Sequence, residues 1–565
     1  MQQYGNSHPP PFLPKTSPVS RDLVLVKGLD EFDYFLNLAV RSLQGLVNRT
    51  TPSIWVQRAQ PVMGDHGWLG RFKEMELIRS YRDVTPLEFL ESHKKFADGA
   101  VIPPRIHCPT AHSELDGHHV AVMAAAAKNL IVSEADLADS LGLEVKLDFS
   151  DKFDNLGESL EYAFENYLTK GLLSTNGAMF ENDSNSSGVF TTDYSIQHRL
   201  FQFTWHTKNR LLPGCMARVD DLKEEETEVI FKVMEYLPPL SPVFGSPGAG
   251  EGYVDEGRLV ITVSRYGKVF VPCAGAGNLS VHSGFPKLDP SVLRRKRSER
   301  PRFKKDMVYV SVHMSDGDNT NLARSHWVHR KDERYGGAWH KRGKIPLGWS
   351  LGPAVFELLP GVARYYFTVD GGKPTEMDEF IMGFCGIAYI FPGEFGKFLE
   401  YDEREKAWED FIGNTNAYME YMDTTVITTQ PHMTNGEVAG EEVFHRYARG
   451  IPRLRGIFNG YNAVAQRYRS LVSVHDGIPV FHSAIGMNRG IPGDGILRRG
   501  VQKMVGSQRP AFIHLFVIPM GSDLHYIADE LRGLPEDFEV VRPSTMAEIF
   551  HEGALDQEGQ GKRDE

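Results

Sequence analysis

The chain has few cysteines, no long apolar run and no surplus of positive charge, and each absence argues against a class of protein. Four cysteines are spread over 565 residues and none stands in a CxxC pair, so neither a disulfide framework nor a cysteine zinc cluster is expected. No stretch approaches the ~20 apolar residues that cross a bilayer, and we expect no membrane partner. Acidic residues outnumber basic ones, 74 to 62, which argues against nucleic acid as a partner because phosphates require a basic face.

Both ends of the chain are polar, and the first residues lack the basic and apolar segments of a signal peptide. We therefore predict a disordered leader over residues 1–20, a disordered tail over residues 553–565 and a cytoplasmic location, with a trimmed secreted form as the alternative. The composition, 41% hydrophobic and 24% charged, is that of a soluble multidomain protein.

Short apolar runs alternate with amphipathic patterns over residues 21–170, which predicts a small N-terminal α/β layer domain. The run DLVLVKG is typical of a strand, and residues 32–48 repeat apolar side chains at helical spacing. The pattern is less regular over residues 171–300, where we predict a linking α+β region. Within it, RLVITVSRYGKVFVPC predicts two strands joined by a hairpin at RYGK.

The last large region, residues 301–552, contains a series of apolar runs separated mostly by helical patterns. These runs are MVYVSVHM, IPLGWS, EFIMGF, TTVITT, RGIFNG, IPVFHSA, AFIHLFVIP and FEVV. Runs that are apolar at nearly every position are typical of parallel strands buried on both faces. We predict an irregular (β/α)7–8 barrel-like C-terminal domain, with ARYYFTV as an extra strand candidate.

Polar residues at the ends of these predicted strands form the candidate site, because barrels of this kind bind ligands there. The first strand ends in DGDN, which contains Asp316, Asp318 and Asn319 and is also a common turn composition. The two aspartates could act as general acid and base, with Glu394 as a further carboxylate partner. They could also hold a divalent cation through oxygen atoms; otherwise we expect no cofactor.

Aromatic and histidine side chains near the same strand ends each allow two interpretations. Trp327 and Trp349 could stack on sugar faces or fill a core. His482 could contact substrate or be a buried histidine with satisfied hydrogen bonds. His326 and His329 could complete a metal site with one of the aspartates.

The segment Gly386–Pro392, GIAYIFP, resembles the motif that names the GxGYxYP glycoside hydrolase family. Ala388 stands where the motif has its second glycine, and Phe391 replaces a tyrosine. The segments SLQGLVNRTTPSIWV, GNLSVHSG, SDGDNTN and WSLGPAVFELLP resemble further blocks of the family, in the family's order.

The resemblance implies an N-terminal α/β region, a linking region, a barrel-like domain that carries the motif, and sugar processing. The positions that match the family's blocks are Asp316, Asp318, Asn319 and Tyr389, together with Asn278, Ser280 and His282, which we expect to face the barrel mouth.

We therefore predict a glycoside hydrolase that acts on a glycan or a glycosylated small molecule. The predicted catalytic residues are Asp316, Asp318 and Glu394. The predicted substrate-binding residues are Asn319, Tyr389, Asn278, Ser280, His282, Trp327, Trp349 and His482. A metal-dependent deacetylase-like hydrolase and a non-catalytic carbohydrate-binding protein are the alternatives.

Overall fold

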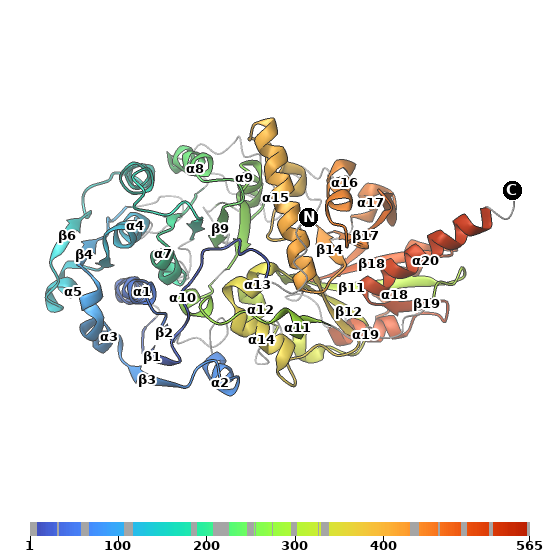
Figure 1. Ribbon diagram of the computed structural model, residues 1–565, viewed down its shortest axis with the longest axis horizontal. Helices are drawn as coiled ribbons and strands as arrows, with labels where there is room; N and C mark the ends of the chain where they lie inside the picture. The colour runs from blue at the N-terminus through green and yellow to red at the C-terminus, as the bar shows by residue number, and fades with distance from the viewer. Residues whose placement is uncertain are drawn as a thin grey trace.

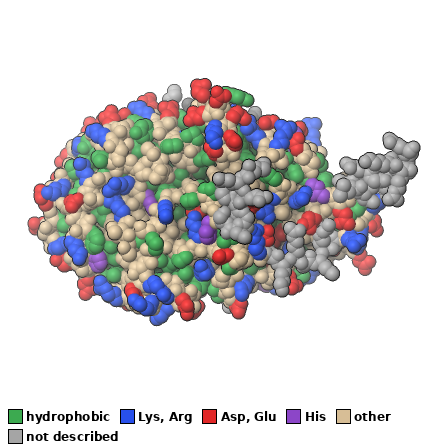
Figure 2. Space-filling model, in the orientation of Figure 1, with side chains coloured by type: hydrophobic (Ala, Val, Ile, Leu, Met, Phe, Trp, Pro, Cys, Tyr) green, Lys and Arg blue, Asp and Glu red, His purple; other side chains and the backbone are tan. Residues whose placement is uncertain are grey.

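The computed structural model shows an α/β chain with three small parallel sheets in its N-terminal half and a closed parallel barrel in its C-terminal half (Figure 1). The structure describes residues 8–30, 33–57, 67–106, 117–181, 189–206, 225–245, 254, 256–273, 275–294, 302–325, 327–328, 338–429, 440–460, 464–487, 494–518 and 524–561. Within these ranges, no helix combines the length and the apolar character that crossing a bilayer requires. Lys, Arg, Asp and Glu side chains are interspersed over the face shown in Figure 2.

The first two sheets have three parallel strands each, in the orders β2-β1-β3 and β5-β4-β6. Their strands are β1 (Asp22–Val26), β2 (Ile54–Val56), β3 (Ser80–Val84), β4 (Gly99–Ile102), β5 (Leu130–Val132) and β6 (Val145–Asp148). The helices of this part are α1 (Tyr34–Asn48), α2 (Trp68–Glu74), α3 (Pro86–His93), α4 (His118–Lys128), α5 (Ala135–Ser140) and α6 (Leu156–Ala163). Local sequence explains their starts: the Asp33 side chain caps α1, and Thr85 with Glu88 forms a capping box at α3.

The third sheet has four parallel strands in the order β10-β9-β7-β8. They are β7 (Ala178–Phe180), β8 (Phe201–Phe203), β9 (Pro242–Gly245) and β10 (Val269–Pro272), with helices α7 (Thr192–His198), α8 (Glu225–Tyr236) and α9 (Glu256–Arg265). The first strand of the predicted hairpin is in fact α9. Because β9 and β10 are parallel, the chain must cross over between them, and a hairpin cannot supply that connection.

The ends of the chain differ from the disordered leader and tail that we predicted. From residue 8 the leader packs on the protein: Leu13 is buried, and Phe12 meets Tyr418 with ring centroids 5.6 Å apart. At the other end, the tail prolongs helix α20 (Pro543–Gly561). Apolar side chains within residues 8–20 therefore hold the leader on the protein in spite of its polar composition. The helix that begins at Pro543 continues into the polar tail.

The barrel contains seven strands, and the strand order β12-β13-β14-β15-β17-β18-β11 closes through pairing of β11 with β12. The seven are β11 (Val308–Gly317), β12 (Leu347–Leu351), β13 (Asp378–Met382), β14 (Val426–Thr429), β15 (Gly456–Asn459), β17 (Ile478–Met487) and β18 (Ala511–Val517). Two further strands lie outside the barrel. β16 (Val472–His475) pairs with the first residues of β17, and β19 (Phe538–Val541) pairs with the first residues of β11. The predicted barrel is confirmed, whereas ARYYFTV lies in helix α14 (Pro360–Thr368), which begins with proline at its first position.

Helix α20 closes the amino-terminal end of the barrel. Met546 and Ala547 of this helix share a buried apolar cluster with inward-facing strand residues such as Tyr309 and Phe481. The next inward layer contains His313 and His514, stacked with centroids 4.6 Å apart. The other helices around the barrel are α12 (Thr320–Arg324), α13 (Pro353–Leu358), α15 (Tyr401–Tyr421), α16 (Glu441–Gly450), α17 (Ala465–Tyr468), α18 (Ile496–Val505) and α19 (Leu524–Arg532).

The block Asn278–His282 joins the third sheet to the first, around the short helix α10 (Leu279–His282); α11 (Pro290–Leu293) follows it. Asn278 Oδ1 accepts hydrogen bonds from Gln44 Nε2 at 2.7 Å and from the Val56 N–H at 2.8 Å, and its Nδ2 donates to the Val56 carbonyl. Ser280 Oγ lies 2.5 Å from Asp193 Oδ2. These fully buried contacts lie between the two sheets, which gives the side chains a structural role in place of the barrel-mouth position that we expected.

The third residue of this block, His282, is equally buried and packs against Trp55 with ring centroids 4.9 Å apart. Burial lowers its pKa to about 3, so the imidazole is neutral. Its surroundings are therefore those of a core histidine.

We expect the variant Asn278→Ala to lower the free energy of unfolding by about 2–4 kcal/mol, because Gln44 and Val56 would lose buried partners and alanine disfavours the left-handed φ of this position. Chemical denaturation of the full chain measures this. Asn414→Ala, at a half-buried position of α15, is the control and should change stability by less than about 0.5 kcal/mol. An unchanged stability for Asn278→Ala would contradict the structural role.

Candidate functional site

Asp316 lies at the carboxyl end of β11, where the strand departs from regular geometry. The pairing of β11 with β12 shifts register between Met314 and Gly317, and Asp316 has a left-handed φ of 64°. An irregularity of this kind turns a side chain away from its strand's alternation and is common beside active sites. It follows that Asp316 is held in a special backbone conformation at the end of the barrel where ligands bind.

The strands around this turn approach each other too closely for larger residues. A Cβ added at Gly317 would lie 1.8 Å from the carbonyl oxygen of Ser350, and one at Gly383 would lie 1.8 Å from Ser350 Oγ. A Cβ at Gly352 would lie 2.9 Å from Asp318 Cα. We call residues Asp316–Asn319 the acidic turn. The glycines allow β11, β12 and β13 to pack directly against it.

Both aspartates have raised pKa values although their side chains remain partly exposed. Burial, with the negative charges of Asp318 and Glu256, raises the pKa of Asp316 to about 8. Burial also raises the pKa of Asp318 to about 7; backbone N–H groups oppose the shift, and the charge of Glu256 adds to it. Asp316 Oδ2 has no hydrogen-bond partner among the described residues. The group therefore retains a proton near neutral pH, as a pair whose titrations are coupled.

The motif segment Gly386–Pro392 reaches this turn by pairing with the third sheet. Tyr389 and Phe270 of β10 exchange two backbone hydrogen bonds, of 3.0 and 2.9 Å, and the Phe391 N–H donates to Ser264 Oγ at 2.9 Å. Phe391 itself is fully buried, so the phenol lost at this motif position would have pointed into a core. The pairing fixes the backbone of Tyr389 beside helix α9.

Glu256, the first residue of α9, completes the acidic group. Tyr389 donates a side-chain hydrogen bond to it, and burial together with the charge of Glu256 raises the pKa of Tyr389. The same carboxylate acts on both Asp316 and Asp318, while its own side chain is exposed. Sequence analysis missed Glu256 because it precedes a run that was interpreted as a strand, RLVITV; an acidic residue just before an apolar run is also typical of a helix start.

Glu394, which we predicted as a catalytic carboxylate, is bound by two cations. Arg265 Nε lies 2.7 Å from its Oε2, and Lys397 Nζ lies 2.8 Å from its Oε1. The carboxylate is buried, and both of its oxygens are paired. These contacts attach the loop after the motif to the end of α9, which accounts for Glu394 without a role in chemistry.

The two tryptophans predicted to contact sugar lie in a buried aromatic cluster. Trp327 meets Trp349 with ring centroids 5.1 Å apart, and both pack with Trp339; Trp349 Nε1 donates to Asp378 Oδ1 at 2.9 Å. All three indoles are fully buried. The cluster packs directly against the end of β11, since a Cβ at Gly317 would lie 2.6 Å from the Trp327 ring.

His482 is likewise enclosed by protein groups. Asn459 Nδ2 lies 2.9 Å from its Nδ1, Ser473 Oγ lies 3.0 Å from its Nε2, and Tyr468 stacks on its ring. Burial lowers the pKa of His482 to about 3, so it stays neutral. Asn319, by contrast, sits in the acidic turn, where its side chain caps α12 and remains partly exposed. His326 and His329 lie outside the described residues.

Comparisons with known proteins agree with this architecture. A match described as "GxGYxYP putative glycoside hydrolase C-terminal domain" covers residues 306–551, and one described as "GxGYxYP third domain" covers residues 177–284. The fold is similar to that of a crystal structure described as a putative hydrolase from Bacteroides thetaiotaomicron, with a TM-score of 0.71, 18% identity and 96% of each chain covered. No curated protein matches the chain. Since the two matches span the barrel and the third sheet, the chain belongs to the GxGYxYP family.

Proposed function

We propose that the chain is a glycoside hydrolase whose reaction takes place at Asp316, Asp318, Glu256 and Tyr389. The observation that carries this proposal is the pair of aspartates with raised pKa values, about 8 and about 7, beside a third carboxylate. Glycoside hydrolysis requires one protonated and one ionised carboxyl group on either side of the scissile bond. The acidic group supplies both forms near neutral pH.

Asp316 is the proposed general acid. Its pKa of about 8 keeps most of the population protonated at neutral pH, and its buried Oδ2 has no hydrogen-bond partner among the described residues. Proton donation neutralises the departing alkoxide, which is the most costly charge in the transition state for a sugar or alkyl leaving group. Once the proton has left, the negative charges of Asp318 and Glu256 favour its return from water.

Glu256 is the proposed second carboxylate, which stabilises or attacks the positively charged sugar carbon or activates water. Its exposure keeps it hydrated, Tyr389 donates a hydrogen bond to it, and its charge acts on both aspartates. The partner carboxylate that we first assigned, Glu394, is already neutralised by Arg265 and Lys397. The substrate class is a glycan or a glycosylated small molecule, as the family description suggests.

We expect Asp316→Asn to lower kcat/KM on 4-nitrophenyl or alkyl glycosides by at least about 100-fold, the usual contribution of general acid catalysis. Activity on 2,4-dinitrophenyl glycosides of the same sugar should fall far less, because that leaving group departs without a proton. Glu256→Gln should lower both. A panel of aryl α- and β-glycosides identifies the sugar, and steady-state kinetics then measures each variant.

The matched control is Glu394→Gln, which removes a charge from a carboxylate that is paired with cations. It should stay within about threefold of the wild-type kcat/KM at temperatures where it is folded. Equal losses for Asp316→Asn on both leaving groups would contradict the acid role. Sugar binding without turnover across the panel would favour a carbohydrate-binding protein instead.

A second prediction needs no substrate. Because the folded state raises the pKa of Asp316 above its usual range, the folded chain binds more protons than the unfolded chain between the two pKa values. The stability from this group is present at low pH and is lost as the pH rises through about 8. Asparagine does not titrate, so Asp316→Asn should melt at a higher temperature than wild type near pH 9, and the difference should shrink toward pH 5.

Thermal unfolding of the full chain followed across this pH range measures the effect. Asp370→Asn is the control, since the Asp370 side chain is 98% exposed and forms a surface ion pair with Lys373. That variant should show no pH-dependent difference from wild type. A constant difference between Asp316→Asn and wild type at all pH values would mean that the carboxyl titrates normally.

A further inference from the structure

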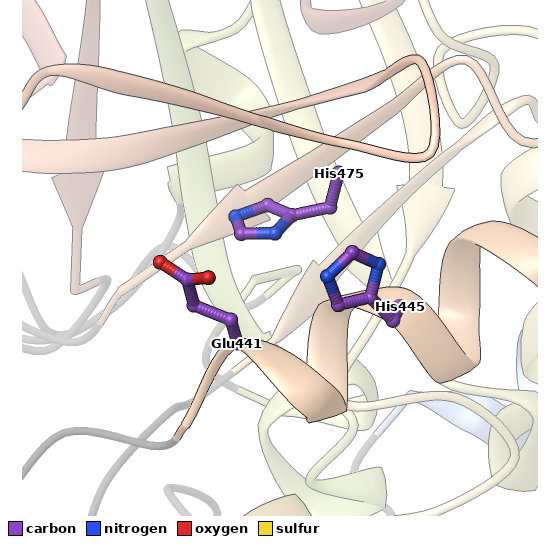
Figure 3. A group of neighbouring side chains, drawn as sticks. All are labelled: Glu441, His445 and His475. Carbon is purple, nitrogen blue, oxygen red and sulfur yellow. The ribbon is translucent and has the colours of Figure 1, made fainter.

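A second group of potential ligands lies away from the acidic turn, on elements that the proposed reaction does not use. Glu441, His445 and His475 point toward one another (Figure 3), and one ligand atom from each lies within 4.8 Å of the other two. Among the residues that the structure describes, this is the one cluster of three His, Cys, Asp or Glu side chains with such spacing. His475 is buried, His445 is half-buried and Glu441 is exposed.

Helical spacing and a tight hairpin bring the three side chains together. Glu441 and His445 are four residues apart in α16, so they lie on one face of the helix. His475 ends β16, and the turn to β17 consists of Asp476 and Gly477, both with positive φ, of 47° and 79°. A two-residue turn of this kind fixes the register of the hairpin and therefore the position of His475.

Hydrogen bonds hold the outer nitrogen of each imidazole. Asp476 Oδ2 lies 2.7 Å from His445 Nδ1, and a carboxylate can only accept, so Nδ1 donates and Nε2 is the nitrogen of this ring that can bind a metal ion. Ser473 Oγ lies 2.9 Å from His475 Nε2, which leaves Nδ1 of that ring facing the other two side chains. Metal-binding histidines are oriented by outer hydrogen bonds of this type, most often to a carboxylate.

Charges around the cluster suit a divalent cation held by one carboxylate and two neutral rings. Arg449 Nε lies 2.9 Å from Asp476 Oδ2, so the carboxylate that orients His445 is itself neutralised. The remaining negative charge in the cluster is that of Glu441. Two histidines and one glutamate are a known ligand set for zinc, with the fourth position open to water.

We propose that His445 Nε2, His475 Nδ1 and the Glu441 carboxylate bind a Zn²⁺-like divalent ion that links α16 to the β16–β17 hairpin. In a tetrahedral zinc site, ligand atoms are about 3.3 Å apart, given metal–nitrogen distances of about 2.0–2.1 Å. The separations of up to 4.8 Å therefore have to close by small side-chain rotations on binding. The exposed position of Glu441 leaves it free to rotate.

The experiment uses the full-length chain, stripped with a chelator and dialysed. Titration with ZnCl2 by calorimetry should show one equivalent bound with a Kd below about 10 µM. Co²⁺ should give the visible absorption of a four- or five-coordinate nitrogen and oxygen site. Zinc should also raise the melting temperature of the stripped protein by mass action.

His445→Ala and His475→Ala should each weaken zinc binding by at least about 100-fold, and Asp476→Asn, which removes only the orienting carboxylate, by about 10- to 100-fold. Glu441→Gln is matched by Glu442→Gln, which alters the adjacent carboxylate that pairs with Arg446 and should bind zinc as wild type does. His93→Ala, on α3, is the histidine control. Circular dichroism and melting without metal confirm that each variant is folded.

Wild-type binding weaker than about 100 µM would overturn the proposal and leave the cluster as an ion-pair and hydrogen-bond group. Tight binding that survives both His445→Ala and His475→Ala would also overturn it, because the ion would then sit elsewhere. These readouts are independent of turnover, so this result and that of the glycosidase test are separate.

Discussion

The position of the acidic turn depends on how closely three barrel strands approach one another. Ser350 lies between Gly317 and Gly383, and neither glycine has room for a Cβ. This packing leaves the Asp316 side chain only partly exposed, and burial is the largest cause of its raised pKa. Wider spacing of the strands would hydrate the carboxyl and return the pKa to its usual range. The proposed chemistry thus rests on backbone packing as much as on the acidic side chains.

The second requirement is the contact between two sheets that are far apart in sequence. The motif segment around Tyr389 pairs with Phe270 of β10, and α9 leads back to Glu256. Neither the barrel nor the third sheet contains all members of the acidic group by itself. The backbone pairing at Tyr389 holds the motif segment against the third sheet, and the hydrogen bond of its phenol to Glu256 joins the two parts of the acidic group.

Sequence patterns predicted every strand of the barrel, because parallel strands buried on both faces are apolar throughout. They also located Asp316 and Asp318 at a strand end. The patterns could not separate polar residues that face a ligand from those that face another sheet: Asn278 and Ser280 satisfy buried backbone and side-chain groups, and their spacing carries no sign of this. The β-branched run after Glu256 favoured a strand, but the parallel pairing of its neighbours required a helix.

Charge compensation distinguishes the carboxylates of this protein better than their sequence context does. Glu394 and Asp316 both come after barrel strands, yet Glu394 is paired with two cations, whereas the described charges that act on Asp316, those of Asp318 and Glu256, are negative. A poorly hydrated acid without a nearby cation destabilises the folded state when ionised, and such arrangements are concentrated at functional sites. The same criterion applies to Glu441, whose neighbours in the cluster are two imidazoles and for which the described residues supply no arginine or lysine partner. In the part of the chain that the structure describes, a carboxylate without a cationic partner is thus common to the proposed reaction site and the proposed metal site.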